Sequence, residues 1–188
     1  MRSARVIIFT MALGVAAPAM MVGAPALAQT AATAPDPARD ATRENLRALL
    51  AVQGPKIGVS FHQSAKQPYN FVGSMTQDMK NSDSLEIVIS VTAQNTLGFR
   101  VYPHYKGGYI NLGRVRDSGS FAHKLLKFGD DNFFFTGVDA ESDTFFGYTI
   151  TLESGFPEAS INVVLASLKN QDRFVGELRT AIDGSAAQ

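Results

Sequence analysis

The sequence predicts an α+β fold in which helices cover one face of a largely antiparallel sheet. Apolar residues recur with period two through the centre of the chain and with helical spacing on either side. The connections between strands are mostly short enough to be hairpins, which join antiparallel neighbours. The predicted order is helix, three or four strands, helix, two strands, helix.

The first helix is expected to follow Asp40 or Thr42, because either residue can act as an N-cap. Its apolar face is formed by Leu46, Leu49 and Leu50. The pair Gly54-Pro55 is a helix stop signal. Residues 56–62 alternate apolar and small side chains, which predicts a half-buried strand.

Residues 63–84 are mostly polar, and we interpret them as a long connection with room for one short strand. The alternation of residues 85–91 and 97–101 predicts two strands joined by a polar turn. Gly107-Gly108 predicts a tight hairpin into a strand over 109–115, because two glycines readily adopt positive φ angles.

The second half of the chain begins with a helix capped by Ser118 or Ser120 and closed by Gly129. Its apolar residues are Phe121, Leu125 and Phe128. Strands over 132–139 and 144–153 follow, joined by an acidic turn. The last predicted element is a long helix that opens near Pro157. Its apolar stripe comprises Ile161, Val164, Leu165, Leu168, Val175, Leu178 and Ile182.

Residues 1–28 have the pattern of a secretory signal peptide. Arg2 and Arg5 precede an uncharged apolar run, and Ala26-Leu27-Ala28 matches a cleavage site. We therefore expect a periplasmic or secreted protein after cleavage near Ala28. The remaining chain is divided into a flexible linker over 29–40, one domain over 41–183 and a disordered tail over 184–188.

Composition excludes several classes of function. The whole chain has 17 basic and 17 acidic residues, and removal of the leader leaves a slightly acidic protein. Nucleic-acid binders need a basic stripe, so no nucleic-acid partner is expected. The absence of cysteine excludes disulfides, thiol catalysis, cysteine metal sites and a lipoprotein anchor. No membrane insertion is expected after cleavage.

The order of elements resembles a known family. Residues 85–178 are similar to the YbjN-type bacterial domain in having a hairpin region, a short helix over 121–128, a strand pair and a long terminal helix. The leading helix over 43–52 also fits this domain. That domain shares the fold of type III secretion chaperones. Residues 121–124 and 132–135 depart from the segments that the family usually has there. The resemblance implies a non-enzymatic accessory, chaperone-like or regulatory protein without catalytic residues or a cofactor.

The sequence contains few of the residue patterns that are typical of catalytic or metal-binding sites. The three histidines, His62, His104 and His123, lack the spacing of metal motifs, although folding could assemble them. A hydrolase site is the third hypothesis, with His123 as base and Asp130 or Asp139 as its orienting group. Asp139, Glu141 and Asp143 alternate as calcium ligands do, but a solvated acidic hairpin fits them better.

Aromatic residues carry the candidate binding site. If Phe146 and Tyr148 face the helices, Phe145 lies on the opposite sheet face, because the strand period is two. That face must then be covered by residues 63–84, a second subunit or a ligand.

Tyrosine and arginine also gather near the hairpin, as they do in binding sites. The candidate binding residues are Arg100, Tyr102, His104, Tyr105, Tyr109 and Phe145. Cross-strand stabilisation of an ordinary hairpin is the alternative interpretation.

The leading hypothesis is an exported, non-catalytic binding or interaction protein that acts in the periplasm. A protein partner or a second copy in a dimer is expected, and neither a metal nor a cofactor. The alternative is a carrier of a small ligand in a cavity between the sheet and the terminal helix.

Overall fold

The computed structural model describes residues 36–132 and 134–184. The predicted signal peptide lies outside the described residues, as do residues 29–35 of the predicted linker and 185–188 of the predicted tail. Within the described part of the chain, no helix has the length and apolar character needed to span a bilayer.

The strands form one antiparallel sheet in the order β1-β2-β3-β4-β7-β6, and β5 pairs with the end of β4. Their bounds are β1 His62–Gln63, β2 Asn70–Met75, β3 Ser84–Val91, β4 Thr96–Tyr105, β5 Gly108–Tyr109, β6 Phe135–Val138 and β7 Thr144–Thr151. Every second residue of β3 is buried, because these side chains face the helices. The prediction of an α+β fold with a largely antiparallel sheet is confirmed.

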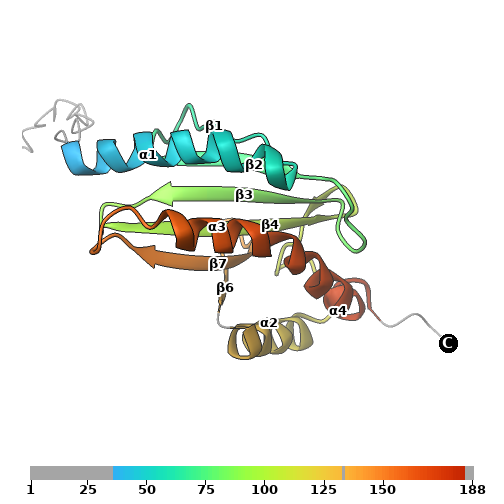
Figure 1. Cartoon of the computed structure of the whole chain (residues 1–188). Coiled ribbons are helices and arrows are strands. Elements are labelled where there is room, and N and C mark those ends of the chain that lie inside the picture. Colours follow the sequence, from blue (N-terminus) through green and yellow to red (C-terminus); the bar gives the residue numbers. More distant parts are fainter. Residues whose placement is uncertain (1–35, 133, 185–188) are drawn as a thin grey trace, which may run out of the picture. The chain divides into compact units, whose positions relative to one another are not determined.

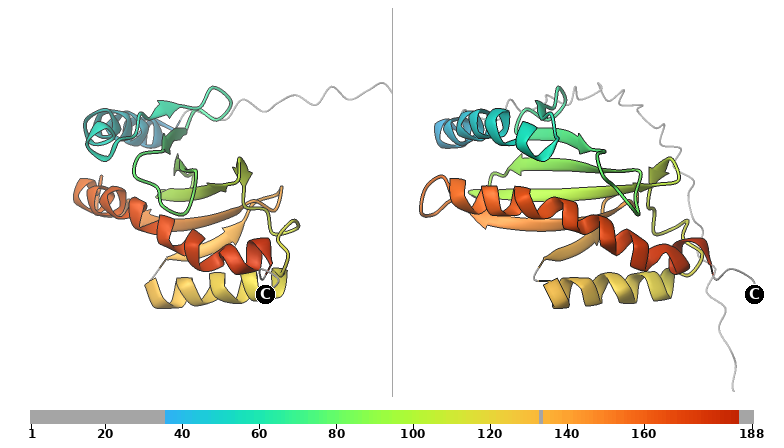
Figure 2. Two further views of the ribbon diagram at one scale, coloured as in Figure 1. Left: turned by 90° about the vertical axis from the view of Figure 1, so that its right-hand side faces the viewer. Right: turned by 45° about the vertical axis from the view of Figure 1, so that its right-hand side comes forward.

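The helices lie on one side of this sheet (Figure 1). Their bounds are α1 Pro37–Gln53, α2 Ser118–Asn132, α3 Glu158–Ser167 and α4 Asp172–Asp183, with short 3-10 turns η1 Pro55–Ile57 and η2 Leu168–Gln171. Helices α1 and α3 pack side by side, and α2 packs against α4 and β6. Figure 2 shows that no helix of the described residues covers the opposite face of the sheet. We call this the open face.

Two apolar clusters form the core. One joins α1 and α3 to the central strands, with Phe71 and Phe99 among its fully buried side chains. The other joins α2 and α4 to β7 through Phe121, Phe146 and Phe174. Burial of this apolar area is the main stabilising term of such a domain.

The first third of the chain differs from its predicted structure. Helix α1 begins at Pro37, because Asp36 caps it by accepting the Arg39 N–H at 3.0 Å and proline suits the first helical turn. Residues 56–62 were predicted as a strand, but η1 and a left-handed Gly58 at φ 72° replace most of it. Residues 70–75, within the predicted connection, form β2 and pair with β3 along its length.

The hairpin after β4 turns one residue earlier than predicted. Tyr105 pairs with Gly108, so Lys106 and Gly107 form the two-residue turn with φ angles of 54° and 83°. Two positive φ angles are the signature of a type I′ turn, which fits the twist of a hairpin. The strand predicted over 109–115 ends at Tyr109.

Two predicted helices also have different limits. Asp117 caps α2 through the Ser120 N–H at 2.9 Å, in place of either predicted serine. The helix continues past Gly129, whose missing side chain leaves room for the Phe134 carbonyl. The long terminal helix is interrupted by η2, so α3 and α4 are separate helices.

The interruption coincides with a buried carboxylate at the start of α4. Asp172 is 7% exposed and accepts the backbone N–H groups of Lys80, Asn81 and Ser82 at 2.8 to 3.1 Å. The Ser82 hydroxyl at 2.6 Å and the Asn81 side-chain amide at 3.1 Å also donate hydrogen bonds to this carboxylate. Burial raises the pKa of Asp172, but these hydrogen bonds outweigh it and hold the pKa below its ordinary value. We call this contact the Asp172 clasp.

Replacing the clasp carboxylate should destabilise the fold. Asp172→Ala leaves three backbone N–H groups without their acceptor, so the free energy of unfolding should fall by about 3 kcal/mol in urea denaturation at pH 7. Asp130→Ala, at an exposed position of α2, is the control and should change it by less than about 0.5 kcal/mol. Equal stability of the two variants would contradict the clasp.

The pH dependence gives a second readout of the same contact. Since folding lowers the pKa of Asp172, its contribution is complete above the ordinary aspartate pKa of about 3.9. The stability difference between the wild type and Asp172→Asn should therefore be constant near neutral pH. It should shrink as the pH falls below that value.

Candidate binding groove on the open face

One row of side chains crosses the open face from β2 to β6. Val72 pairs with Val88, Val88 with Arg100, Arg100 with Gly147, and Gly147 with Phe135. Directly opposite residues of neighbouring strands point to the same face. Arg100 therefore lies in the middle of the open face, and Phe135 lies at its edge with 43% of its surface exposed.

Five of the six predicted binding residues come together on this face. The ring centroids of Tyr102 and Phe145 are 5.5 Å apart, and those of Tyr102 and Tyr109 are 5.9 Å apart. His104 lies 4.2 Å from Tyr109, and the Arg100 guanidinium lies 4.8 Å from the Phe145 ring. These side chains form a continuous cluster at the end of β4, which we call the Tyr102 cluster.

Tyr105 does not belong to the Tyr102 cluster. Its side chain packs against the α2–α4 core, and its hydroxyl donates to Asp183 at 2.8 Å. Lys106 reaches the same carboxylate at 2.8 Å. Tyr105 follows His104 directly, and neighbouring residues of a strand point to opposite faces, so its side chain lies on the helix side of the sheet.

The cover over Phe145 comes from the sheet itself. Phe145 is 6% exposed, and its ring is surrounded by Arg100, Tyr102 and an edge-on Phe135 at 6.0 Å. Gly137 provides space for this ring, because a Cβ atom there would lie 2.8 Å from it. The segment 63–84, predicted as one possible cover, instead adds β2 to the sheet.

A groove of about 500 Å³ runs along the open face beside the Tyr102 cluster. It is lined by Gln67, Asn70, Glu86, Val88, Ser90, Arg100, Tyr102, Tyr109, Asp139, Ala140, Glu141 and Asp143. Four of these side chains are carboxylates, and Arg100 is the one cationic side chain in the lining. Among the described residues, none of the four carboxylates takes part in an ion pair.

The acidic turn between β6 and β7 closes one end of this groove. Asp139 accepts the backbone N–H groups of Glu141 at 3.1 Å and Asp143 at 2.9 Å, which fixes the turn. Asn111 donates to Asp143 at 2.8 Å and ties the turn to the segment after β5. The sequence pattern predicts these acids as a hairpin turn but does not place them in the candidate binding site.

Hydrogen bonding and burial keep the two groove tyrosines neutral. The Tyr109 hydroxyl donates to Glu86 at 2.9 Å. Burial, followed by this hydrogen bond, raises the pKa of Tyr109 to about 12. Burial also raises the pKa of Tyr102, against the opposing charge of Arg100. Both phenols are therefore neutral hydrogen-bonding groups at neutral pH.

The hydrolase hypothesis has no assembled site in the described ranges. His123 is exposed on α2, and no hydrogen bond joins it to Asp130 or Asp139. His62 lies on β1 and His104 on β4. Within residues 36–132 and 134–184, no three metal-ligating side chains come close enough to hold a metal ion.

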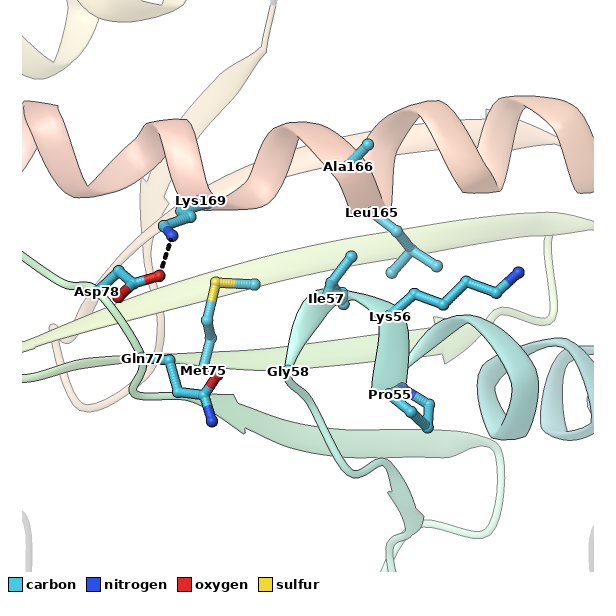
Figure 3. A pocket seen from close by; sticks show the side chains of 10 residues that line it. All are labelled: Pro55, Lys56, Ile57, Gly58, Met75, Gln77, Asp78, Leu165, Ala166 and Lys169. Carbon is cyan, nitrogen blue, oxygen red and sulfur yellow. Dashed lines mark hydrogen bonds and ion pairs between the residues drawn. The ribbon is translucent and has the colours of Figure 1, made fainter.

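A second pocket, of about 360 Å³, lies between η1, the end of β2 and the α3–η2 segment (Figure 3). Ile57, Met75 and Leu165 give it apolar walls. Lys56 lies at its rim, and Lys169 pairs with Asp78 at 2.8 Å. This pocket occupies the position that the carrier hypothesis requires, between the sheet and the C-terminal helices.

Comparison with known proteins identifies the fold. No protein-family model and no curated protein matches the sequence. A chain in the crystal structure of the ExsC–ExsE complex superposes with a TM-score of 0.50 at 15% identity, covering 76% of this chain and 98% of that chain. The two chains therefore share a fold. At this identity the likeness concerns the fold alone, so the resemblance to the YbjN family stays a prediction.

The Glu86–Tyr109 contact can be tested by titration. Glu86→Gln removes the negative charge beside the phenol, so the pKa of Tyr109 should fall from about 12 toward its ordinary value of 10. NMR titration of labelled tyrosine, assigned with Tyr109→Phe, measures this shift. Glu153→Gln, at an exposed position after β7, should leave the Tyr109 pKa unchanged.

The same shift has a consequence for stability. Because folding raises the pKa of Tyr109, its contribution is complete below pH 10 and is lost as the pH rises toward 12. In Glu86→Gln, folding raises the pKa of Tyr109 by less, so this contribution to stability should be lost over a narrower range of pH. An unchanged Tyr109 pKa in that variant would contradict the contact.

Proposed function

We propose that the protein is exported by its predicted signal peptide and acts in the periplasm as a non-catalytic binding protein. Its role would be accessory, chaperone-like or regulatory, and its partner another protein or a second copy of the chain. The observation that carries this proposal is the open face, where the Tyr102 cluster borders a groove of about 500 Å³.

The composition of the open face supports this proposal. The other face of the sheet is occupied by α1 and α3, whereas no helix within residues 36–132 and 134–184 lies over the open face (Figure 2). Tyr109 and Phe135 are 41% and 43% exposed there. Partly exposed tyrosine and phenylalanine beside arginine are typical of protein-binding surfaces.

The comparison adds a second line of support. The solved structure with the similar fold is named as a complex of two proteins, ExsC and ExsE. A fold that occurs in a protein complex is compatible with a binding role here. The groove residues themselves, rather than the fold, must decide what this chain binds.

Site-specific crosslinking tests the binding role of the groove. The full chain, leader included, carries a photoreactive phenylalanine analogue at Val88, which lines the groove. Irradiation of cells should give a protein adduct in the periplasmic fraction. An adduct at twice the subunit mass identifies a second copy, and any other mass identifies a different protein.

The matched control places the same analogue at Leu126, which is 73% exposed on α2. This position should give no adduct or a much weaker one. Equal adducts from both positions, or none from Val88, would contradict a binding role for the open face. Adducts confined to the cytosol would contradict the proposed compartment.

The pocket between η1 and α3 favours a second candidate function, that of a small-ligand carrier. Its apolar walls and the ammonium group of Lys56 suit an amphipathic anion, whereas Lys169 is paired with Asp78. Ala166 lines this pocket and is itself exposed, so a larger side chain there can occupy the pocket without disturbing the core.

Native mass spectrometry of the protein purified from its own host tests the carrier function. The wild type should show an added small-molecule mass that Ala166→Trp lacks, because the indole fills the pocket. Val163→Trp, 70% exposed on the same helix, should retain the added mass. If the wild type shows no added mass, the carrier function is contradicted, and protein binding by the open face is the remaining candidate.

A further inference from the structure

The groove on the open face has chemically different ends. Glu86, Val88 and Ser90 lie along β3 and face the groove in turn. Uncharged Gln67 and Asn70 lie near Ser90, whereas the acidic turn and Tyr109 lie near Glu86. A ligand along β3 would therefore meet amide and hydroxyl groups first and carboxylates last.

The acidic end has an excess of negative charge that the described residues do not neutralise. Glu86, Asp139, Glu141 and Asp143 take part in no ion pair there. Arg100 is the one cation in the lining, so four carboxylates face a single guanidinium and the groove keeps an excess of negative charge. The whole chain is electrically neutral, so this charge is a local feature and not a consequence of composition.

The aromatic rings at the same end favour a cationic ligand over a metal ion. Tyr102 and Tyr109 meet edge to face at 5.9 Å beside Glu86. Lysine and arginine side chains bind favourably against aromatic rings, particularly where a carboxylate is also present. Their methylene groups can lie on Val88, an apolar groove residue that a bare metal ion would not use.

The length of the groove fits a short stretch of extended chain. Ser90 and Glu86 are four residues apart on one strand, a distance of about 13 Å at about 3.3 Å per residue. About four extended residues therefore span it. Hydroxyl and amide groups at the Ser90 end can hydrogen-bond a peptide backbone.

We propose that this groove binds a basic, extended segment of a partner polypeptide. A lysine or arginine side chain of that segment lies among Glu86, Asp139 and Glu141, against the ring of Tyr109, which is 41% exposed. This assignment rests on the proposed binding function and names the chemistry of the partner. The contact is electrostatic, so its affinity falls as the salt concentration rises.

Fluorescence anisotropy with a labelled tetralysine peptide tests the proposal, with a labelled tetraglutamate peptide as the opposite-charge probe. The chain without residues 1–28 should bind tetralysine in low salt and not bind tetraglutamate. The triple variant Glu86→Gln, Asp139→Asn and Glu141→Gln should weaken tetralysine binding by about tenfold or more. These amides keep the oxygen acceptors of Tyr109 and of the turn, so thermal melts should confirm that the variant is folded.

The matched control removes three carboxylates from other exposed positions, as Asp130→Asn, Glu153→Gln and Glu177→Gln. It should change tetralysine binding by less than about twofold, because the groove is intact. Equal weakening by both triple variants would overturn the groove as the site. Spermine, which has the charge without a peptide backbone, should bind more weakly, and equal binding would overturn a polypeptide partner.

Different results would overturn the proposed binding function and the proposed basic partner. A Val88 adduct without tetralysine binding would retain the proposed function and overturn the basic partner. Tetralysine binding that depends on the three groove carboxylates, without a Val88 adduct, would support the cationic ligand class and overturn the proposed function.

Discussion

The buried carboxylate of Asp172 is the contact on which the arrangement of α4 and the sheet depends. It accepts three consecutive backbone N–H groups from residues 80–82, which come just before β3. A buried charge is stable only where hydrogen bonds replace its hydration, and this loop supplies them. Gly176 lets the next turn of α4 approach Asn81, since a Cβ atom there would lie 2.6 Å from the amide oxygen. The start of α4 and the start of β3 are thereby held together.

From this contact, hydrogen bonds lead to the candidate groove. Asp83 follows the clasp, and its carboxylate accepts the backbone N–H of Gly107 in the hairpin turn at 2.7 Å. At the other end of α4, Asp183 accepts the hydroxyl of Tyr105 at 2.8 Å. The hairpin is thus held through both ends of one helix. That hairpin carries Tyr109, whose hydroxyl meets Glu86 on β3. These contacts with α4 therefore help to position the groove residues, although α4 packs on the other side of the sheet.

The sequence predicted those elements whose local pattern agrees with their environment. Residues 85–91 alternate in the sequence and are alternately buried in β3. Residues 70–75 combine a glycine and two polar side chains with three apolar ones, so the pattern predicted only a connection with room for a short strand, where the structure has a strand paired with β3 along its full length. The terminal helix has an unbroken apolar stripe, and its interruption follows from Asp172 binding a loop distant in sequence. The spacing of apolar residues around residue 172 does not reveal such a contact.

The candidate site was predictable where the period of a strand or the position of the hairpin places its aromatic residues. Alternate residues of β4 point to the same face, so Tyr102 could be grouped with its neighbours two residues away, and the same rule separates Tyr105. Glu86 and Asp139 come from other elements, and only the pairing register and the acidic turn bring them to Tyr102. These acids give the groove its charge, and with it the basis for a basic partner. A shared fold at 15% identity does not preserve such a charge pattern, so the partner must be inferred from these side chains.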